Sequence, residues 1–174
     1  MHGNRDFLLG EAFARQSGCH LIDDPSIIEL DGQRVLLSHG DQLCTDDHDY
    51  QAFRQQVRSQ TFQREFLSLA IEQRQHQARQ YREQSKTVTR LKAQDIMDVN
   101  TGAVRQLMQQ FDVDCLIHGH THRPAIHQLP DKQRRIVLGD WGTTGSVLIH
   151  DNNGLNLHSF DATTLTQLAD SIAA

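Results

Sequence analysis

The sequence predicts an α/β domain in which a layered sheet is interrupted by a helical, basic insertion. Short apolar runs of strand length, separated by turn residues, lie on both sides of the segment 50–92. That segment has no glycine or proline and is rich in Gln, Arg and Glu, as solvated helices are. At 174 residues the chain can bury one core. We therefore expect a single domain over residues 1–174, with residues 50–92 inserted into it.

The elements expected before the insertion are a helix and short strands joined by a tight turn. They are a helix over Asp6–Gln16 that Gly18 would end, apolar runs over 20–22 and 27–30 separated by Pro25, and a strand over 34–38 after the turn Asp31-Gly32. The insertion itself should form two or three helices with polar outer sides, and Phe62 and Phe66 mark one apolar face. We expect these aromatic rings to pack the insertion on the main domain rather than to contact a ligand.

After the insertion the pattern returns to one helix followed by strands. We expect a helix over 99–111, strands over 114–117, 125–129, 135–138, 146–149 and 155–158, and a marginal helix over 163–174. Turn residues separate the strands, as in Pro130-Asp131 and Asn152-Asn153-Gly154. The chain thus alternates between helical and strand periodicity, which is typical of a layered α/β fold.

The net charge of -5 conceals a strong asymmetry. Between positions 53 and 92 there are nine basic and three acidic residues, a local charge of +6, so the remainder carries -11. A basic module on an acidic body is typical of a protein that binds an anionic ligand or surface, although a merely solvated helix would have the same composition. The three cysteines are widely spaced, and no apolar run approaches the ~20 residues of a membrane span. We therefore expect a cytoplasmic protein.

Three motifs combine polar residues with a glycine at the end of an expected element. They are Gly3-Asn4-Arg5-Asp6, His39-Gly40-Asp41 and His118-Gly119-His120-Thr121-His122. The two histidine motifs follow apolar strands, and such strand ends converge on one edge of an α/β sheet, where ligands bind. Imidazole nitrogens and an Asn amide oxygen together suit a divalent ion such as Mn²⁺. The pattern predicts a metal site more strongly than a histidine-rich surface loop.

Together these motifs resemble those of the calcineurin-like metallophosphoesterases, and most closely the UDP-2,3-diacylglucosamine pyrophosphohydrolases of lipid A biosynthesis. The resemblance rests on the segments 3–10, 38–47 and 118–124. It implies a β-sandwich flanked by helices, a site for two Mn²⁺ ions, and a helical lid over the substrate at 50–92. It also implies hydrolysis of UDP-2,3-diacylglucosamine to UMP and 2,3-diacylglucosamine 1-phosphate. A lipid substrate implies peripheral contact with the anionic cytoplasmic face of the inner membrane. No nucleic acid is expected as a partner.

The resemblance also assigns roles to individual residues. Asn4, His39 and His120 match the ligands of one metal, and His122 matches a ligand of the other. His120 and Arg5 are the expected catalytic residues; wider relatives have a histidine at the position of Arg5, and an arginine there would stabilise phosphate charge because it does not deprotonate. The expected substrate contacts are Asn4, Arg5, Asp47, Arg82, Ser85, Thr89, Lys92 and His120. We expect His118 to support the loop as a neutral imidazole.

The same resemblance implies two further motifs, an Asp-x-His and a Gly-Asp, on strands that precede Gly3-Asn4. Only Met1 and His2 stand before that motif, and Gly139-Asp140 follows the histidine motif instead of preceding it. We therefore expect an N-terminally incomplete domain without its first strands, and little activity from this chain alone. A non-catalytic remnant and another calcineurin-like phosphoesterase are the alternatives. A zinc hydrolase with an H-x-H-x-D-H motif is disfavoured because His122 replaces the required Asp.

Overall fold

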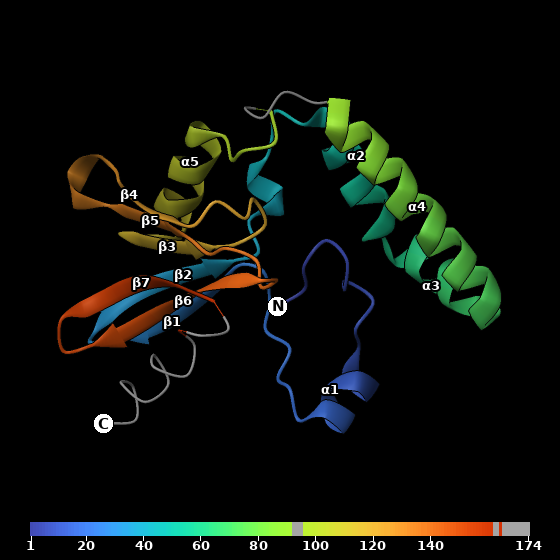
Figure 1. Ribbon diagram of the computed structural model, residues 1–174, viewed down its shortest axis with the longest axis horizontal. Coiled ribbons are helices and arrows are strands. Elements are labelled where there is room, and N and C mark those ends of the chain that lie inside the picture. The colour runs from blue at the N-terminus through green and yellow to red at the C-terminus, as the bar shows by residue number, and fades with distance from the viewer. Residues whose placement is uncertain (92–95, 162–163, 165–174) are drawn as a thin grey trace.

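A five-stranded mixed sheet forms the centre of the molecule (Figure 1). The computed structural model describes residues 1–91, 96–161 and 164. The strands are β1 (Ser26–Leu30), β2 (Gln33–Ser38), β3 (Cys115–His118), β4 (Ala125–Gln128) and β5 (Arg134–Val137), in the order β1-β2-β3-β5-β4. The three inner strands run parallel, and β1 and β4 pair with them in the antiparallel sense. The inner strands therefore end together at one edge of the sheet.

Both faces of this sheet are covered. Helix α5 (Thr101–Phe111) packs on one face, where Leu36, Met108 and Leu116 are completely buried. The hairpin of β6 (Thr144–Asp151) and β7 (Gly154–Asp161) covers the other face through Leu148 and Leu155. Alternate residues of β2 and β3 thus belong to two separate apolar clusters, because successive side chains of a strand point to opposite faces of the sheet. Figure 1 shows the resulting order of layers: helix, sheet, hairpin.

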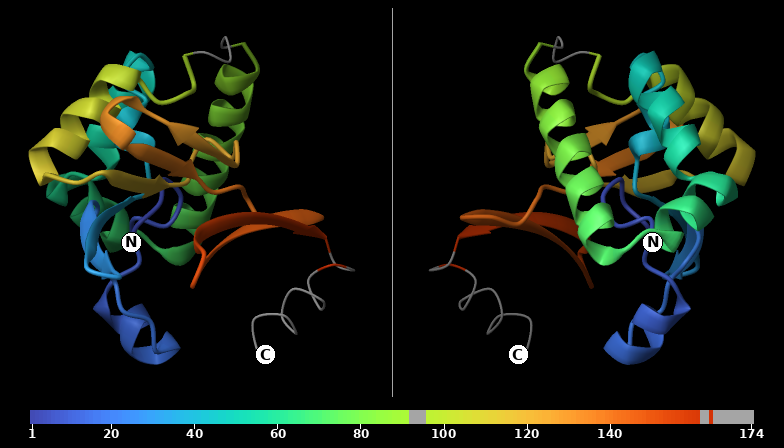
Figure 2. Two further views of the ribbon diagram at one scale, coloured as in Figure 1. Left: turned by 90° about the vertical axis from the view of Figure 1, so that its left-hand side faces the viewer. Right: turned by 90° about the vertical axis from the view of Figure 1, so that its right-hand side faces the viewer.

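Three helices project to one side of the sheet and form a separate wall (Figures 1 and 2). They are α2 (His48–Val57), α3 (Gln60–Ser68) and α4 (Ile71–Leu91). The carboxylate of Asp47 accepts the Tyr50 N–H and caps α2, and the Ser59 hydroxyl caps α3 in the same way. Aromatic rings join the helices to one another, since Phe53 and Phe62 both lie against Tyr81 at centroid distances of 5.6 and 6.4 Å.

The N-terminal residues form a loop between the sheet and the helical wall, followed by α1 (Glu11–Ser17). The prediction of a helix over Asp6–Gln16 is wrong in its first turn. Residues 4–8 form a turn in which the Leu9 N–H donates to the Asp6 carbonyl, and Gly10 has an extended backbone that delays the helix to Glu11. The apolar run 20–22 is also not a strand.

The other predicted elements are confirmed within one to three residues at their ends. Insertion residues form three helices, and the turn Asp31-Gly32 has two positive φ values, 49° and 74°, as a tight hairpin requires. Lys92 and nearly all of the expected helix over 163–174 lie outside the described residues. The mixed α/β architecture agrees with the predicted class.

Candidate active site

One cavity of about 350 Å³ lies between the N-terminal loop and the helical wall. Five of the residues expected to contact substrate line it, namely Asn4, Arg5, Asp47, Arg82 and Ser85. Much of the remaining lining is apolar and aromatic and includes Phe53, Phe62, Phe66, Tyr81 and Val88. Phe62 and Phe66 stack at 5.7 Å and both line the cavity, so these rings pack on each other within the insertion, where packing on the main domain was expected. The side chain of Thr89 and the whole of Lys92 are not among the described residues.

The register of the sheet brings two of the predicted metal ligands together. Ser38 of β2 is paired with His118 of β3, so the residues that follow these strands leave the sheet side by side. The Gly119 N–H donates to the His39 carbonyl at 3.1 Å, and the rings of His39 and His120 lie edge to face with centroids 5.0 Å apart. Asn4 is the third residue expected to bind the same metal as His39 and His120. It is also close, because its N–H donates to His39 Nε2 at 3.3 Å.

Close packing at this edge depends on a glycine. Gly40 has a φ of 102°, and a Cβ atom there would lie 2.8 Å from Nδ1 of His118. His118 is 1% exposed; its Nδ1 donates to the Gly119 carbonyl, and its Nε2 accepts from Arg135. This arrangement agrees with the expectation that His118 supports the loop and does not bind a ligand.

Burial keeps these imidazoles neutral. It lowers the pKa of His39 below the ordinary value and lowers the pKa of His120 and of His118 to about 4. At neutral pH each ring therefore has a nitrogen lone pair, which is what a metal requires of histidine. Tyr50, which lines the cavity, packs on the ring of His120 at 5.6 Å. Tyr50 thus links the cavity to His120, although neither His39 nor His120 is among the residues that line it.

The donor set for a metal is only partly present. Among residues 1–91, 96–161 and 164, no three His, Cys, Asp or Glu side chains are grouped so that they could hold an ion. His39 and His120 fit a metal as neutral nitrogen donors, but they do not form a complete site. His122 contacts a different residue: its Nδ1 lies 3.6 Å from Oδ2 of Asp140, and both side chains are largely exposed.

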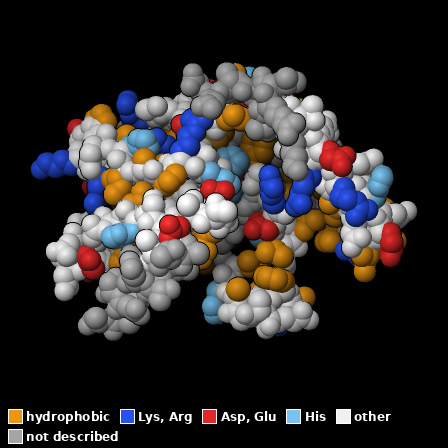
Figure 3. All heavy atoms as spheres, in the orientation of Figure 1, with side chains coloured by type: hydrophobic (Ala, Val, Ile, Leu, Met, Phe, Trp, Pro, Cys, Tyr) orange, Lys and Arg blue, Asp and Glu red, His pale blue; other side chains and the backbone are white. Residues whose placement is uncertain are grey.

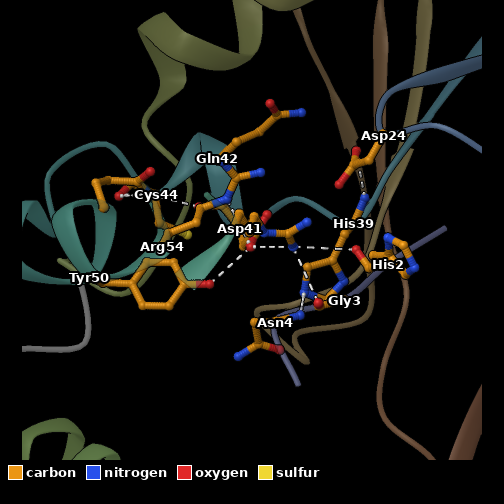
Figure 4. A network of polar contacts seen from close by, with 12 residues as sticks. His2, Gly3, Asn4, Asp24, His39, Asp41, Gln42, Cys44, Tyr50 and Arg54 are labelled. Carbon is orange, nitrogen blue, oxygen red and sulfur yellow. Dashed lines mark hydrogen bonds and ion pairs between the residues drawn. The ribbon is translucent and has the colours of Figure 1, made fainter. Parts of the chain in front are cut away.

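A buried carboxylate joins the histidine edge to the helical wall (Figure 4). Asp41 has no exposed surface. Its Oδ2 accepts hydrogen bonds from the hydroxyl of Tyr50 at 2.9 Å and from Nη2 of Arg58 at 3.2 Å, and it forms an ion pair with Nε of Arg54 at 3.0 Å. Burial alone would raise the pKa of this carboxyl, but the adjacent Arg54 holds it below its usual range. Arg58 also donates to the carbonyl of Gly3 at 3.2 Å, so the same network fixes the N-terminal loop.

The sequence motifs did not identify this network. A signal was available, because Tyr50, Arg54 and Arg58 are spaced by four residues and therefore share one face of α2. Nothing in that spacing specifies Asp41 as the partner of that face. The pairing depends on how α2 returns across the 3-10 turn Asp41–Leu43.

No family profile matches the chain, but curated relatives do. It is 49% identical over 164 residues to a UDP-2,3-diacylglucosamine hydrolase of Pseudomonas syringae pv. tomato, 92% of this chain and 66% of the relative. An enzyme of the same name from Sodalis glossinidius is 47% identical over 160 residues, 92% of this chain and 67% of the relative. A third, from Histophilus somni, is 50% identical over 154 residues, 88% of this chain and 66% of the relative.

The chain therefore spans about two thirds of the length of the curated relatives that it matches. The similarity includes nearly all residues of the chain, and identities of 47–50% over such a length show membership of the same family. On these comparisons, the chain belongs to the UDP-2,3-diacylglucosamine hydrolase family.

Proposed function

We propose that this chain forms the substrate-binding part of a hydrolase that cleaves the pyrophosphate bond of UDP-2,3-diacylglucosamine. The products would be UMP and 2,3-diacylglucosamine 1-phosphate, in lipid A biosynthesis. One observation carries the proposal: five of the residues expected to contact this substrate line one cavity, and Tyr50, which also lines it, packs on the neutral imidazole of His120. The names of the relatives support the choice of substrate.

The lining of the cavity suits an acylated sugar phosphate. Arg5 and Arg82 place positive charge at its border, where phosphate oxygens could be bound by charge-assisted hydrogen bonds. The aromatic rings of Phe53, Phe62 and Phe66 offer an apolar surface to an acyl chain. In this proposal the helical wall is the lid over the substrate. Figure 3 shows basic side chains on this wall, beside the hollow that separates it from the sheet.

We include Mn²⁺ in the proposal as the metal of the reaction. Asn4, His39 and His120 would contribute to one site and His122 to another, and the ions would supply hydroxide and charge stabilisation at the phosphorus. The incomplete donor set among the described residues leads us to expect hydrolysis by this chain to be far slower than by the Sodalis glossinidius relative. Arg5 cannot supply a proton, so its contribution would be to phosphate charge.

A hydrolysis assay tests the proposal. The 174-residue chain and the Sodalis glossinidius relative are incubated with Mn²⁺ and UDP-2,3-diacylglucosamine in detergent, and released UMP is measured. We expect UMP from the relative and much less from the chain, together with binding of 2,3-diacylglucosamine 1-phosphate to the chain. Arg82→Ala should weaken that binding about 10-fold, because it removes a charged hydrogen bond, whereas Arg64→Ala on the exposed side of α3 serves as the matched control.

Two results would contradict the proposal. The first is failure of the sugar phosphate to bind the chain at all, and the second is an equal affinity of the Arg82→Ala variant. Turnover by the chain equal to that of the relative would contradict the expected slow hydrolysis and leave the substrate assignment intact.

A second function, binding of substrate or metal without turnover, is favoured by one specific observation. His39 and His120 lie together as neutral donors, but among the described residues no third His, Cys, Asp or Glu side chain is grouped with them so that the three could hold an ion. Saturable Mn²⁺ binding that is lost in His39→Gln, with no release of UMP under any condition, would favour this second function.

We also propose peripheral contact with an anionic membrane on the cytoplasmic side. None of the described helices is long and apolar enough to cross a membrane. The segment 53–92 carries a charge of +6, and Leu67 and Ile71 near the α3–α4 turn are 48% and 59% exposed, so the wall offers both charge and apolar surface. Sedimentation with anionic vesicles, but not with neutral ones, is the expected result, and equal binding to both would contradict it.

A further inference from the structure

Trp141 is the single tryptophan of the chain, and 71% of its surface is exposed. This exposure is unusual for so large an apolar side chain. Trp141 lies in the loop between β5 and β6, immediately after Asp140. The loop that carries this ring contacts the histidine loop through Asp140, so the exposed indole is a candidate surface for a ligand.

The ring is held in place although it is exposed. Its Nε1–H donates to the carbonyl of Ser146 at 2.9 Å, and the indole lies edge to face with Phe160 at 5.3 Å. Phe160 itself is fixed against Gly145, where an added Cβ would lie 2.5 Å from the phenyl ring. The indole is thus anchored at one edge and keeps exposed surface for a ligand, which reduces the entropy cost of stacking.

The loop of Trp141 lies against the histidine loop. Asp140 Oδ2 is 3.6 Å from Nδ1 of His122, and Gly139 approaches the ring of Pro124 so closely that an added Cβ would lie 3.3 Å from it. The Gly139 N–H donates to the Ser146 hydroxyl at 2.6 Å, which ties the two ends of the Trp141 loop together. Trp141 is therefore held in a loop that is fixed beside His122.

These contacts connect three regions in a row: the cavity, the histidine loop and the Trp141 loop. The cavity meets His120 through Tyr50, and His122, two residues further on, meets the Trp141 loop through Asp140. The substrate named for the relatives has the same order of parts: an acylated sugar, a pyrophosphate and a uridine. With the sugar in the cavity and the pyrophosphate at the histidines, the nucleoside would reach the Trp141 loop.

We propose that Trp141 is a stacking platform for the uracil base of the nucleotide. This inference rests on the proposed function, because that function supplies the nucleotide and its orientation. Every nucleobase has a π-face, and the exposed, edge-anchored indole provides the complementary surface. The role of Trp141 is to bind and orient the nucleotide part of the substrate, and no bond is made or broken there.

The single tryptophan makes the test specific. Fluorescence of Trp141 in the 174-residue chain is titrated with UMP and, separately, with ribose 5-phosphate, which has the sugar and phosphate but no base. We expect saturable quenching by UMP and none by ribose 5-phosphate. Quenching by both would overturn the proposal, because the phosphate alone would then be responsible, and so would an absence of quenching by UMP.

Variants extend the test to affinity, measured by equilibrium dialysis of labelled UMP. Trp141→Ala should weaken UMP binding about 10-fold or more, and Trp141→Phe, which keeps an aromatic ring, should weaken it far less. Phe13→Ala removes a partly exposed ring from α1 and is the matched control, for which we expect no change. Equal UMP affinity of the Trp141→Ala and unmodified chains would overturn the proposal. UMP binding is measured without turnover, so the result can be interpreted even if the chain does not hydrolyse UDP-2,3-diacylglucosamine.

Discussion

The two walls of the candidate site are built in different ways. The histidine wall is the end of a sheet, where residues 35–38 of β2 and Cys115–His118 of β3 are paired residue by residue and nearly all of these side chains are buried. The helical wall consists of α2–α4, most of whose residues are exposed. It meets the rest of the site through polar contacts centred on the buried carboxylate of Asp41, with further hydrogen bonds from Arg58 to the Gly3 carbonyl and from Gln51 to the Asp41 carbonyl. The first wall is positioned by backbone pairing and the second by charge.

This difference predicts different responses to substitution. A sheet edge distributes its stability over many hydrogen bonds and apolar contacts, so it should fail only when close packing at the edge is prevented. A wall attached by a buried ion-pair network should fail when one member is removed, because the others are left as unpaired buried charges. The following substitutions separate the two cases.

The largest effect is expected for Asp41→Ala. Loss of this carboxylate leaves Arg54 and Arg58, whose side chains are 19% and 20% exposed, without their shared partner. We expect a loss of about 3 to 5 kcal/mol in the free energy of unfolding, measured by urea denaturation, and faster tryptic cleavage within α2–α4. Glu65→Ala, which removes an exposed carboxylate from α3, is the control and should be nearly neutral. Equal stability of the two variants would show that the helical wall does not depend on charge.

The next largest effect is expected for Gly40→Ala at the histidine wall. The positive φ of 102° strains any other residue, and the new methyl group would lie 2.8 Å from His118. We expect a loss of about 1 to 3 kcal/mol, again by urea denaturation. Gly10→Ala is the matched control, because its φ is -120° and no atom lies within 4 Å of the place that its new methyl group would take. A neutral Gly40→Ala would mean that the edge adapts more easily than its packing indicates.

A smaller effect is expected for Asp98→Asn, which tests how the histidine loop is held to the sheet. Asp98 lies 2.9 Å from Arg123, next to His122, and 3.9 Å from Arg135 of β5. Partial burial alone would raise the pKa of this carboxyl, but the Val99 N–H and Arg123 hold it below the ordinary 3.8. We expect a loss of about 1 kcal/mol at neutral pH.

The sign of the pH dependence follows from that lowered pKa. The stabilisation by Asp98 is fully present above pH 3.8 and is lost as the pH falls through the lower pKa of the folded state. In Asp98→Asn the free energy of unfolding should therefore fall less steeply as the pH is lowered into the acid range, which denaturation at a series of pH values measures. Asp112→Asn, whose carboxylate is fully exposed beside Arg34, should leave that pH dependence unchanged. An unchanged pH dependence in Asp98→Asn would mean that the carboxylate does not hold the loop.

The smallest effect is expected outside both walls. Glu11 and Arg15 form an exposed i,i+4 pair on α1 at 3.3 Å, with 92% and 71% of their side chains accessible. Glu11→Gln should leave the urea midpoint within experimental error, because water and salt screen such pairs. A clear loss of stability here would weaken the contrast between buried and exposed charge on which the other predictions rest.

Much of the fold could be predicted because strand and helix periodicity are local. The runs around 34–38 and 114–117 predicted β2 and β3, and the glycine-free insertion predicted α2–α4. The convergence of His39 and His120 followed from the rule that parallel strands end at one edge. The start of α1 was wrong because apolar periodicity continued through Gly10, where the backbone is extended.

The candidate site was only partly predictable. The resemblance led to Asn4, Arg5, Asp47, Arg82 and Ser85, which line one cavity, but no local pattern identifies Asp41 as the anchor of α2. The predicted partnership of His122 with a metal remains a prediction. In the structure this side chain is near Asp140, a contact that needs the β5–β6 loop to return beside the histidine loop.

The sequence by itself determined the alternation of elements, the histidine-bearing strand ends and the basic helical insertion, because these depend on residues close together in the chain. Only the tertiary structure decided that Asp41 pairs with Arg58, that Tyr50 packs on His120 and that the Trp141 loop is fixed beside His122. Burial and charge pairing act between residues that folding brings together, and their energies depend on the surrounding dielectric and geometry, which periodicity does not record.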